Sequence, residues 1–364
     1  MTRIALFLGS FFGRGVARVR LNMCATLLDR GYDVDLVVLS GEGDMRQDVP
    51  DGVRLIDLAA PRALAAVPKI RRYLLETQPA ALISAQDHVN VAVLLARRLS
   101  GLNIPTSVSV HNVHTLEASK PPWSKKYWMQ YAVRLIYPWA TIRVSVSSGL
   151  GDTMATVTGL PRDSIETIFN PVIDARLTEL AQEPCPHPWL GDGGPPVVLG
   201  VGRLTFQKDF EGLIESFDSL RQERDVRLVI LGDGFRHDAL VDLITDKGLR
   251  EIVDLPGYVS NPFTYMANAD VFVLSSIHEG LPGVLIQAMG CGCPVVSTDC
   301  PHGPMEILDG GKLGPLVPIK DPQALTTAIA QVLDAPLAPD VLKARAQLFE
   351  ANHILDQYRD RLGF

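Results

Sequence analysis

Short apolar runs alternate with longer amphipathic stretches along almost the whole chain. Runs such as 4–8, 197–201 and 271–274 are almost entirely apolar, which is typical of parallel strands that are covered on both faces. Stretches between such runs, for example 16–29 and 210–221, have the length and spacing of helices. The alternation predicts βαβ units, and therefore an α/β fold built on parallel sheets.

The predicted strands fall into two series. They are 4–8, 34–39, 81–84, 106–110 and 142–146 in the first half, and 197–201, 227–231, 252–255, 271–274 and 294–297 in the second. Between them, residues 183–196 are rich in proline and glycine, as linkers are. This pattern predicts a domain over 1–183, a linker over 184–196, a second domain over 197–338, and a helical segment over 339–364. Two Rossmann-like domains facing a central cleft would place ligands at the carboxyl ends of the strands.

Composition narrows the classes of protein. The 364 residues are 47% hydrophobic and 21% charged, enough for two globular cores. The net charge of −7 argues against nucleic acid as a partner. The five cysteines lack zinc-site spacing and are expected to be free thiols in a reducing compartment. No apolar run approaches the length of a membrane span, and the first residues do not resemble a signal peptide, so we expect a cytoplasmic protein.

The first candidate for chemistry is the glycine-containing loop after the first strand. It includes Gly13 and Gly15 and precedes a helix, whose amino terminus attracts phosphate. The loop does not match GxGxxG, and no acidic ribose ligand follows at the expected place, so a nicotinamide enzyme is disfavoured.

The second candidate follows the strand at 197–201, where the sequence reads GRLTFQKD from Gly202 to Asp209. Arg203 and Lys208 stand five residues apart at a strand exit. A forked guanidinium and a point-like ammonium there can clamp a diphosphate. On composition alone, a solvated turn between strand and helix explains the same residues.

The third candidate follows the strand at 271–274, where a loop containing Glu279 leads into a helix near Pro282. Backbone amides at this helix start suit phosphate or sugar hydroxyls. Gln287 lies one to two turns into the helix, and Glu306 belongs to the loop that follows the next strand. The residues singled out at the helix start are Gly280, Leu281, Pro282, Gly283 and Val284.

These motifs, in this order, resemble the donor-binding core of the retaining GT-B-fold glycosyltransferases of family 4 (glycosyltransferase group 1). That family carries E-x7-E within an EG-x-P…EAM-x-CG-x-P-V stretch, a following loop like DCPxGPxEIL, and a GR-L-x-x-x-K diphosphate clamp. Residues 278–308 and 202–209 match these patterns, and the first half matches more loosely, through His111-Asn112 and Asn170-Pro171.

The resemblance implies roles for particular residues. Arg203 and Lys208, after Gly202, would neutralise the departing diphosphate, and Glu279 would bind the transferred sugar. The amides of residues 280–284 would contact the sugar or phosphate, and Glu306 would form part of the pocket wall. His111 would lie near the transferred sugar, and the loop around Gly13 and Gly15 would cover the phosphates. The last helical segment would brace the first domain, with partner binding as the alternative.

Two positions depart from the family pattern. The second glutamate of E-x7-E, which receives the ribose hydroxyls, is Gln287 here, and an amide offers one acceptor oxygen where a carboxylate offers two. The GGxER-like loop reads RGVAR over 14–18 and lacks one glycine and the glutamate. The sequence therefore indicates the identity of the nucleotide and the contacts of this loop less clearly than it indicates a diphosphate clamp at Arg203 and Lys208.

The expected function is transfer of a hexose or N-acetylhexosamine from a nucleoside-diphosphate sugar, with UDP as the nucleotide, to a saccharide or polyprenyl-linked acceptor in cell-envelope or exopolysaccharide synthesis. Fixed cations and helix amides would replace a metal, so neither metal nor cofactor is expected. A UDP-sugar isomerase or epimerase and a catalytically weak sugar-nucleotide-binding protein are the alternatives.

Aromatic and basic residues alternate between Lys120 and Trp139. The favoured interpretation is a helix packed on the first domain. The alternative is peripheral contact with the inner face of the cell membrane, where such residues are common. The residues of that alternative are Trp123, Lys125, Lys126 and Trp128.

Overall fold

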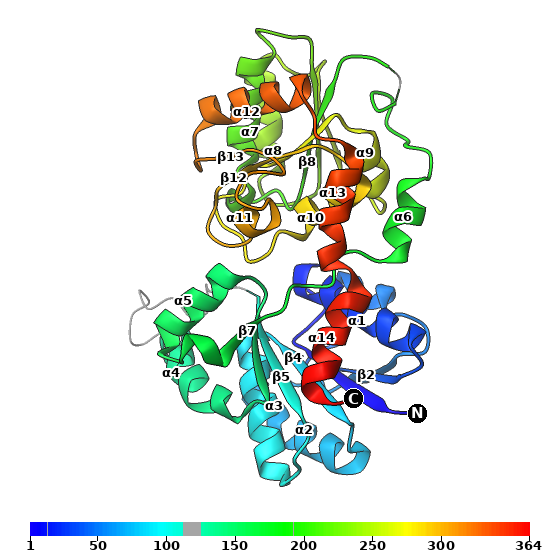
Figure 1. Ribbon diagram of the computed structural model, residues 1–364, viewed down its shortest axis with the longest axis vertical. Helices are drawn as coiled ribbons and strands as arrows, with labels where there is room; N and C mark the ends of the chain where they lie inside the picture. The colour runs from blue at the N-terminus through cyan, green and yellow to red at the C-terminus, as the bar shows by residue number, and fades with distance from the viewer. Residues whose placement is uncertain (13, 112–124, 192) are drawn as a thin grey trace. The chain divides into compact units, whose positions relative to one another are not determined.

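The computed structural model describes residues 1–12, 14–111, 125–191 and 193–364 (Figure 1). Residue contacts divide the chain into two compact units. The first unit comprises Met1–Val172 and Ala351–Phe364, and the second comprises Ile173–Glu350. Of the residues that the sequence analysis names, Gly13, Asn112, Lys120 and Trp123 lie outside the described residues.

The first unit contains a parallel sheet with the strand order β3-β2-β1-β4-β5-β6-β7, an extension of the Rossmann order. Its strands are β1 (Arg3–Leu8), β2 (Asp33–Val38), β3 (Arg54–Asp57), β4 (Ala81–Ala85), β5 (Thr106–Val110), β6 (Ile142–Ser145) and β7 (Ile165–Thr167). The chain order reverses between β1 and β4, and at such a switch point ligands bind at the carboxyl ends of the strands.

Alternating side chains of β1 supply both cores of this unit. Ile4, Leu6 and Leu8 pack with α1 (Arg14–Asp29) and α14 (Ala351–Leu362), which lie side by side on one face (Figure 1). Ala5 and Phe7 pack with α2 (Ala63–Thr77) and α3 (Asp87–Ser100) on the other face. Both faces of the strand are therefore covered, which explains its continuous apolar run.

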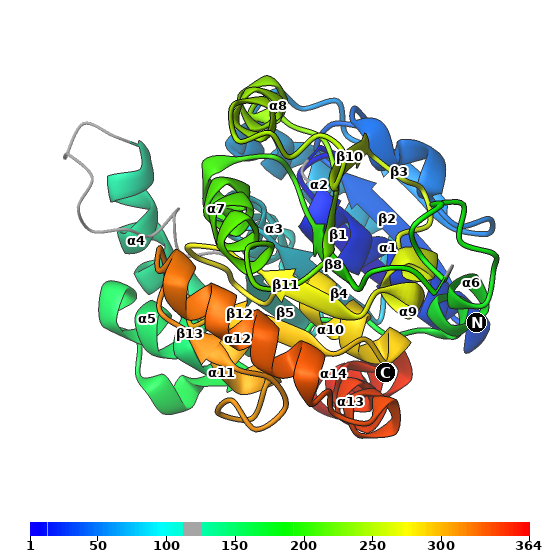
Figure 2. The same cartoon turned by 90° about the horizontal axis from the view of Figure 1, so that it is seen from above.

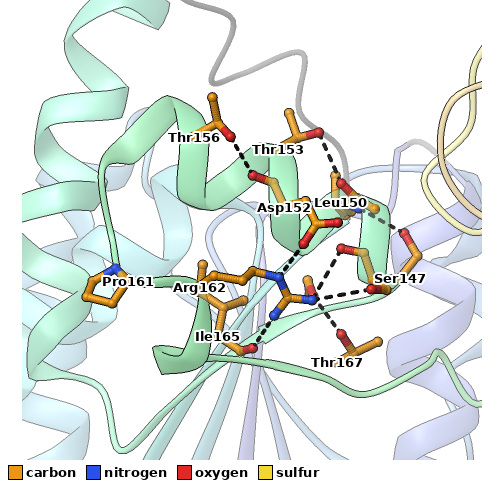
Figure 3. A network of polar contacts seen from close by, with 12 residues as sticks. Ser147, Leu150, Asp152, Thr153, Thr156, Pro161, Arg162, Ile165 and Thr167 are labelled. Carbon is orange, nitrogen blue, oxygen red and sulfur yellow. Dashed lines mark hydrogen bonds and ion pairs between the residues drawn. The ribbon is translucent and has the colours of Figure 1, made fainter.

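Helices α4 (Lys125–Ile136) and α5 (Ser148–Thr158) complete the first unit. Buried Val133 and Gln130 belong to α4, which contacts α3 and α5. The start of α5 is held by a polar network around Arg162, whose guanidinium donates to Asp152 Oδ1 at 2.5 Å and to the Ile165 carbonyl at 2.8 Å (Figure 3). This network joins α5 to β7 at the last strand of the sheet.

The second unit contains a parallel sheet with the order β10-β9-β8-β11-β12-β13, which repeats the Rossmann order. Its strands are β8 (Val197–Val201), β9 (Arg227–Leu231), β10 (Val253–Gly257), β11 (Val271–Leu274), β12 (Val295–Thr298) and β13 (Leu316–Val317). The order reverses between β8 and β11, the two strands that precede the second and third candidate motifs.

Helices cover both faces of this sheet. One core joins β8, β9 and β11 to α7 (Phe210–Leu220), α8 (His237–Asp246) and α12 (Pro322–Asp334), with α7 and α12 side by side (Figure 2). Elsewhere α10 (Gly283–Cys291) contacts α6 (Ala175–Ala181), α9 (Phe263–Asn268) and α13 (Pro339–Ala346). The short α11 (Pro304–Ile307) follows β12.

The boundaries between the units differ from the predicted ones. The first division falls after Val172 and not at residue 183, because α6 contacts α9 and α10. Residues 184–196 accordingly lie within the second unit. The predicted segment 339–364 is interrupted at Gln347–Phe349, with α13 in the second unit and α14 in the first.

Polar contacts and an aromatic pair attach α14 to the first unit. Arg30 Nη1 donates to Asp356 Oδ1 at 2.6 Å, and Arg361 pairs with Glu166. The ring of Phe364 meets that of Tyr32 edge-on at 5.6 Å. In the part of the chain that the structure describes, no helix has both the length and the apolar character needed to cross a membrane.

Candidate active site

The loop after β8 carries the predicted clamp. A short 3-10 turn (Phe206–Lys208) precedes α7, and Lys208 folds back over Gly202. A Cβ atom on Gly202 would stand 3.1 Å from Lys208 Cε, tighter than ordinary van der Waals contact. The glycine therefore leaves room for the lysine stem. Arg203 extends from the same loop and is exposed.

Three hydrogen bonds join this loop to the one that follows β11. The Ile277 amide donates to the Gln207 carbonyl at 2.8 Å, and Gln207 Nε2 donates to the His278 carbonyl at 2.8 Å. Ser275 Oγ donates to the Lys208 carbonyl at 2.7 Å. Because both loops are held at their backbones, the side chains between them have little freedom to separate.

Lys208 and Glu279 meet at this junction. Lys208 Nζ lies 2.5 Å from Glu279 Oε1, and Ser276 Oγ donates to the same oxygen at 2.7 Å. The side chains of Lys208 and Glu279 are only 15% and 10% exposed. A pair so far removed from water is stabilised only when further hydrogen bonds satisfy it, and Ser276 provides one.

The amino terminus of α10 lies directly after this cluster in the chain. The amides of a first helical turn have no acceptor within the helix and carry partial positive charge. Gly303 comes close to the loop that leads into α10, because a Cβ atom there would lie 2.5 Å from Pro282 Cδ. The Glu279 amide also donates to the Pro301 carbonyl at 3.2 Å. The loop after β12 thus supports the loop after β11.

The remaining predicted residues of the second unit lie around this cluster. Pro282 immediately precedes α10, which starts at Gly283 and ends at Cys291, where Gly292 caps it. Leu281 and Pro282 are buried, whereas Gly280, Gly283 and Val284 are partly exposed. Gln287 is partly exposed within α10, and Glu306 is partly exposed in α11, where its carbonyl accepts from Arg345.

Some residues of this junction are not among those predicted. Gln207, Ser275 and Ser276 make contacts described above, and Thr298 Oγ1 donates to the Ser276 carbonyl at 2.6 Å. One feature of the sequence could have identified them: small polar residues directly follow apolar strands, as Ser275 and Ser276 follow β11.

The first unit presents its predicted residues at the carboxyl ends of β1 and β5. Gly15 is exposed in the first turn of α1, which begins at Arg14 and not at Val16. In the loop before it, the Gly9 amide donates to Gln86 Oε1 at 3.0 Å. His111 follows β5 directly and is partly exposed, with its Nε2 3.0 Å from Ser109 Oγ. Desolvation of the ring where it packs against the protein, and secondly the charge of Arg20, lower the pKa of His111 to about 3, so the ring is neutral at neutral pH.

Two cysteine thiols of the second unit are uncharged at neutral pH. Burial, with Glu279 as the second cause, raises the pKa of Cys300 to about 12, and burial raises the pKa of Cys293 above its ordinary range. The five cysteines are free. Among the described residues, no group of three or more histidine, cysteine, aspartate or glutamate side chains is arranged to hold a metal ion.

Solved structures that align with both units define the class of fold. The chain aligns over its whole length with HepE from Anabaena in complex with UDP and glucose, covering all of that chain, with a TM-score of 0.77 and 19% identity. It also aligns over its whole length with the lipopolysaccharide outer core galactosyltransferase WaaB in its apo form, covering 99% of that chain, with a TM-score of 0.75 and 19% identity. The fold is GT-B.

Family models match both halves of the chain. Residues 13–176 match the Glycosyltransferase Family 4 model, and residues 187–350 match the model of glycosyl transferases group 1. The chain therefore matches glycosyltransferase family models over both halves, in the order that the sequence motifs predict.

Curated relatives match over shorter regions. The N-acetylgalactosamine-N,N'-diacetylbacillosaminyl-diphospho-undecaprenol 4-alpha-N-acetylgalactosaminyltransferase of Campylobacter jejuni is 31% identical over 205 residues, 56% of this chain and 54% of that protein. The lipopolysaccharide core biosynthesis glycosyltransferase LpsE of Rhizobium meliloti is 38% identical over 138 residues, 38% of this chain and 39% of that protein. The chain thus spans about half or less of the length of these relatives.

Proposed function

We propose that this protein is a retaining glycosyltransferase that moves a hexose or N-acetylhexosamine from a UDP-sugar to a saccharide or lipid-linked acceptor in cell-envelope or exopolysaccharide synthesis. The observation that carries the proposal is the contact of Lys208 and Ser276 with one oxygen of Glu279. This cluster lies at the carboxyl ends of β8 and β11, the switch point of the second sheet, and next to the start of α10.

The cluster suits a departing diphosphate. When the bond between the sugar's anomeric carbon and the diphosphate oxygen breaks, negative charge develops on that oxygen and positive charge on the sugar. Fixed cations and helix amides stabilise such charge without reorganising. Lys208 and exposed Arg203 would face the diphosphate, with the first-turn amides of α10 beside them.

Glu279 is better suited to orienting the sugar than to attacking it. Its Oε1 already accepts hydrogen bonds from Lys208 and Ser276, which lowers its availability as a nucleophile and leaves Oε2 to accept from a sugar hydroxyl. The acceptor hydroxyl would attack the anomeric carbon from the face that the diphosphate leaves. Its proton would pass to a phosphate oxygen of the leaving group, so that retention needs no covalent intermediate on the enzyme.

The nucleotide and the acceptor are drawn from the relatives. UDP and glucose are bound in the HepE structure, and the names of the two curated relatives refer to an undecaprenol-linked saccharide and to the lipopolysaccharide core. We therefore assign UDP as the nucleotide and a saccharide, free or lipid-linked, as the acceptor. Metal independence is part of the same proposal, because Arg203 and Lys208 supply the positive charge.

Contact with a membrane surface would bring the enzyme to a lipid-linked acceptor. Trp128 is 61% exposed, and its ring lies 5.9 Å from that of Tyr131, also exposed, on α4. Aromatic side chains of this kind settle at the headgroup level of bilayers. Lys125 and Lys126 begin the same helix. Sedimentation with anionic vesicles should be weakened by Trp128→Ala, and unchanged sedimentation would contradict the contact.

The proposal is tested by calorimetric titration with UDP, followed by product analysis with a panel of UDP-sugars. We expect UDP binding, and UDP release that depends on acceptor and persists in a metal chelator. Glu279→Ala should lower kcat by roughly 10²–10³, the usual cost of losing one group that stabilises a transition state. Glu215→Ala in α7, on the same unit, is the matched control. Isomerised sugar without UDP release, or UDP binding without turnover of any donor, would contradict the proposal.

A further inference from the structure

A cation is buried in the first unit beneath the predicted sugar-contacting histidine. Arg20 projects from α1 with 1% exposure. Its Nη2 donates to Ser109 Oγ at 2.7 Å and to the Ser84 carbonyl at 3.3 Å, and its Nη1 lies 3.1 Å from Met23 Sδ. Among the described residues Arg20 has no carboxylate within ion-pair distance. Hydroxyl, carbonyl and sulfur dipoles alone surround a charge that arginine does not give up.

The Ser109 hydroxyl connects this cation to His111. Three groups surround Ser109 Oγ: the Arg20 guanidinium at 2.7 Å, the Ser84 carbonyl at 3.0 Å and His111 Nε2 at 3.0 Å. A hydroxyl has one hydrogen to donate and two lone pairs to accept. The guanidinium can only donate and the carbonyl can only accept. When the serine hydrogen goes to Ser84, His111 must donate from a protonated Nε2.

The same cation opposes a second proton on the ring. The groups associated with Arg20 are Cys24 on α1 and Tyr358 on α14. Burial raises the pKa of Cys24 to about 12 and raises the pKa of Tyr358, so both are neutral at neutral pH. Of these groups only Arg20 is charged, and its repulsion acts with burial against an imidazolium at His111.

We propose that Arg20, acting through Ser109, is a positioning residue that holds His111 as the neutral Nε2–H tautomer and leaves its Nδ1 as a hydrogen-bond acceptor for a sugar hydroxyl. Arg20 itself is too deeply buried to touch a ligand. This assignment rests on the proposed function for the identity of the ligand, but the state of the ring is a property of the protein without any ligand.

Nitrogen NMR of histidine-labelled protein tests the assignment directly. The His111 signals among the eight histidines are identified by their loss in His111→Gln. We expect a protonated Nε2 and an unprotonated Nδ1, with no conversion to the cation near pH 6.5, where an unperturbed histidine in a short peptide added as a standard is about half protonated. A cationic ring, or a proton on Nδ1, would overturn the proposal.

Variants separate the effect of Ser109 on the tautomer of His111 from the effect of Arg20 on its titration. Ser109→Ala should mix the two neutral tautomers, because the hydrogen bond that selects Nε2–H is gone while the charge remains. Arg20→Met should raise the titration midpoint of His111, because one of the two causes that oppose the imidazolium is removed; Arg20→Lys should largely restore it. An unchanged His111 spectrum in both Ser109→Ala and Arg20→Met would also overturn the proposal. If Arg20→Met does not fold, Ser109→Ala and the parent protein still decide it.

Kinetics supply the second readout. Arg20→Met should lower kcat for transfer by about tenfold, of the order of one hydrogen bond, and leave UDP affinity unchanged. Arg97→Met is the matched control, because Arg97 donates to the Ile104 carbonyl and Thr106 Oγ1 at the opposite end of β5. Equal losses in both variants would contradict a specific role. Absence of any transferase activity in the parent protein would refute the proposed function, whereas the NMR result would stand.

Discussion

The carboxyl edges of the two sheets balance buried positive charge in different ways. In the second unit Lys208 is paired with a carboxylate, Glu279, at 2.5 Å. In the first unit Arg20 is surrounded by a serine hydroxyl, a backbone carbonyl and a thioether. An ion pair can exchange its partner for an incoming anion, since each member keeps a small exposed fraction. A cation held by dipoles in the core has no such exchange available and can act only on its neighbours.

Of the substitutions that this comparison suggests, one at Lys208 should change the free energy of unfolding most. Lys208→Met leaves Glu279 in a poorly hydrated position without its cation, and breaking such a pair costs about 3 kcal/mol. The matched control is Lys247→Met. Lys247 pairs with Asp218 at 2.8 Å in the same unit, but both side chains are more exposed, so the cost should stay below about 1 kcal/mol. Urea unfolding of both variants measures the difference, and equal midpoints would remove the basis of the comparison.

A smaller effect is expected where the loop after β12 supports the site. Gly303→Ala introduces a Cβ atom 2.5 Å from Pro282 Cδ at a residue with φ of 94°. Gly310→Ala imposes a similar backbone strain at φ of 68°, but with open space around the new atom. In both variants the strained backbone should lower the free energy of unfolding by about 1 kcal/mol. Only Gly303→Ala should also weaken UDP binding, as calorimetry would show. Equal affinities would mean that this loop does not position α10.

The smallest effect concerns the nucleotide. Gln287→Glu would provide the second glutamate of the E-x7-E pattern on the partly exposed side of α10. One added hydrogen bond to a ribose hydroxyl corresponds to about a fivefold gain in UDP affinity. Calorimetry of the variant with UDP, and with uracil-containing ligands that lack ribose, measures it. A gain for both ligands would exclude the ribose as the cause.

The strand pattern of the sequence accounts for most of the fold. The strands 106–110, 197–201, 227–231 and 271–274 have the predicted bounds. The edge strand β3 was not predicted, because Arg54 and Asp57 frame only two apolar residues, and β13 has only two residues. Domain boundaries depend on distant contacts of α6 and α14 that no local pattern contains.

The nearness of Lys208 to Glu279 could be predicted from the sequence, but the contacts around them could not. The motif spacing brings Lys208 and Glu279 to neighbouring strand ends. It cannot specify that Gln207 and Ser275 join their loops, because that depends on side-chain conformations. The position of Arg20 does have a signal. It stands three residues after Ala17 and four before Cys24, both buried, which places a charged side chain on the apolar face of a helix.

The division of the chain after Val172 and before Ala351 has a consequence for biosynthesis. The second unit is one uninterrupted segment, whereas the first needs residues from both sides of it. A chain emerging in order can complete the second unit before the first has received α14 and the Tyr358 beside Arg20. The surroundings of His111 are therefore among the last parts of the molecule to be assembled. A nascent chain halted before residue 351 would carry the Lys208–Glu279 pair without the finished surroundings of His111.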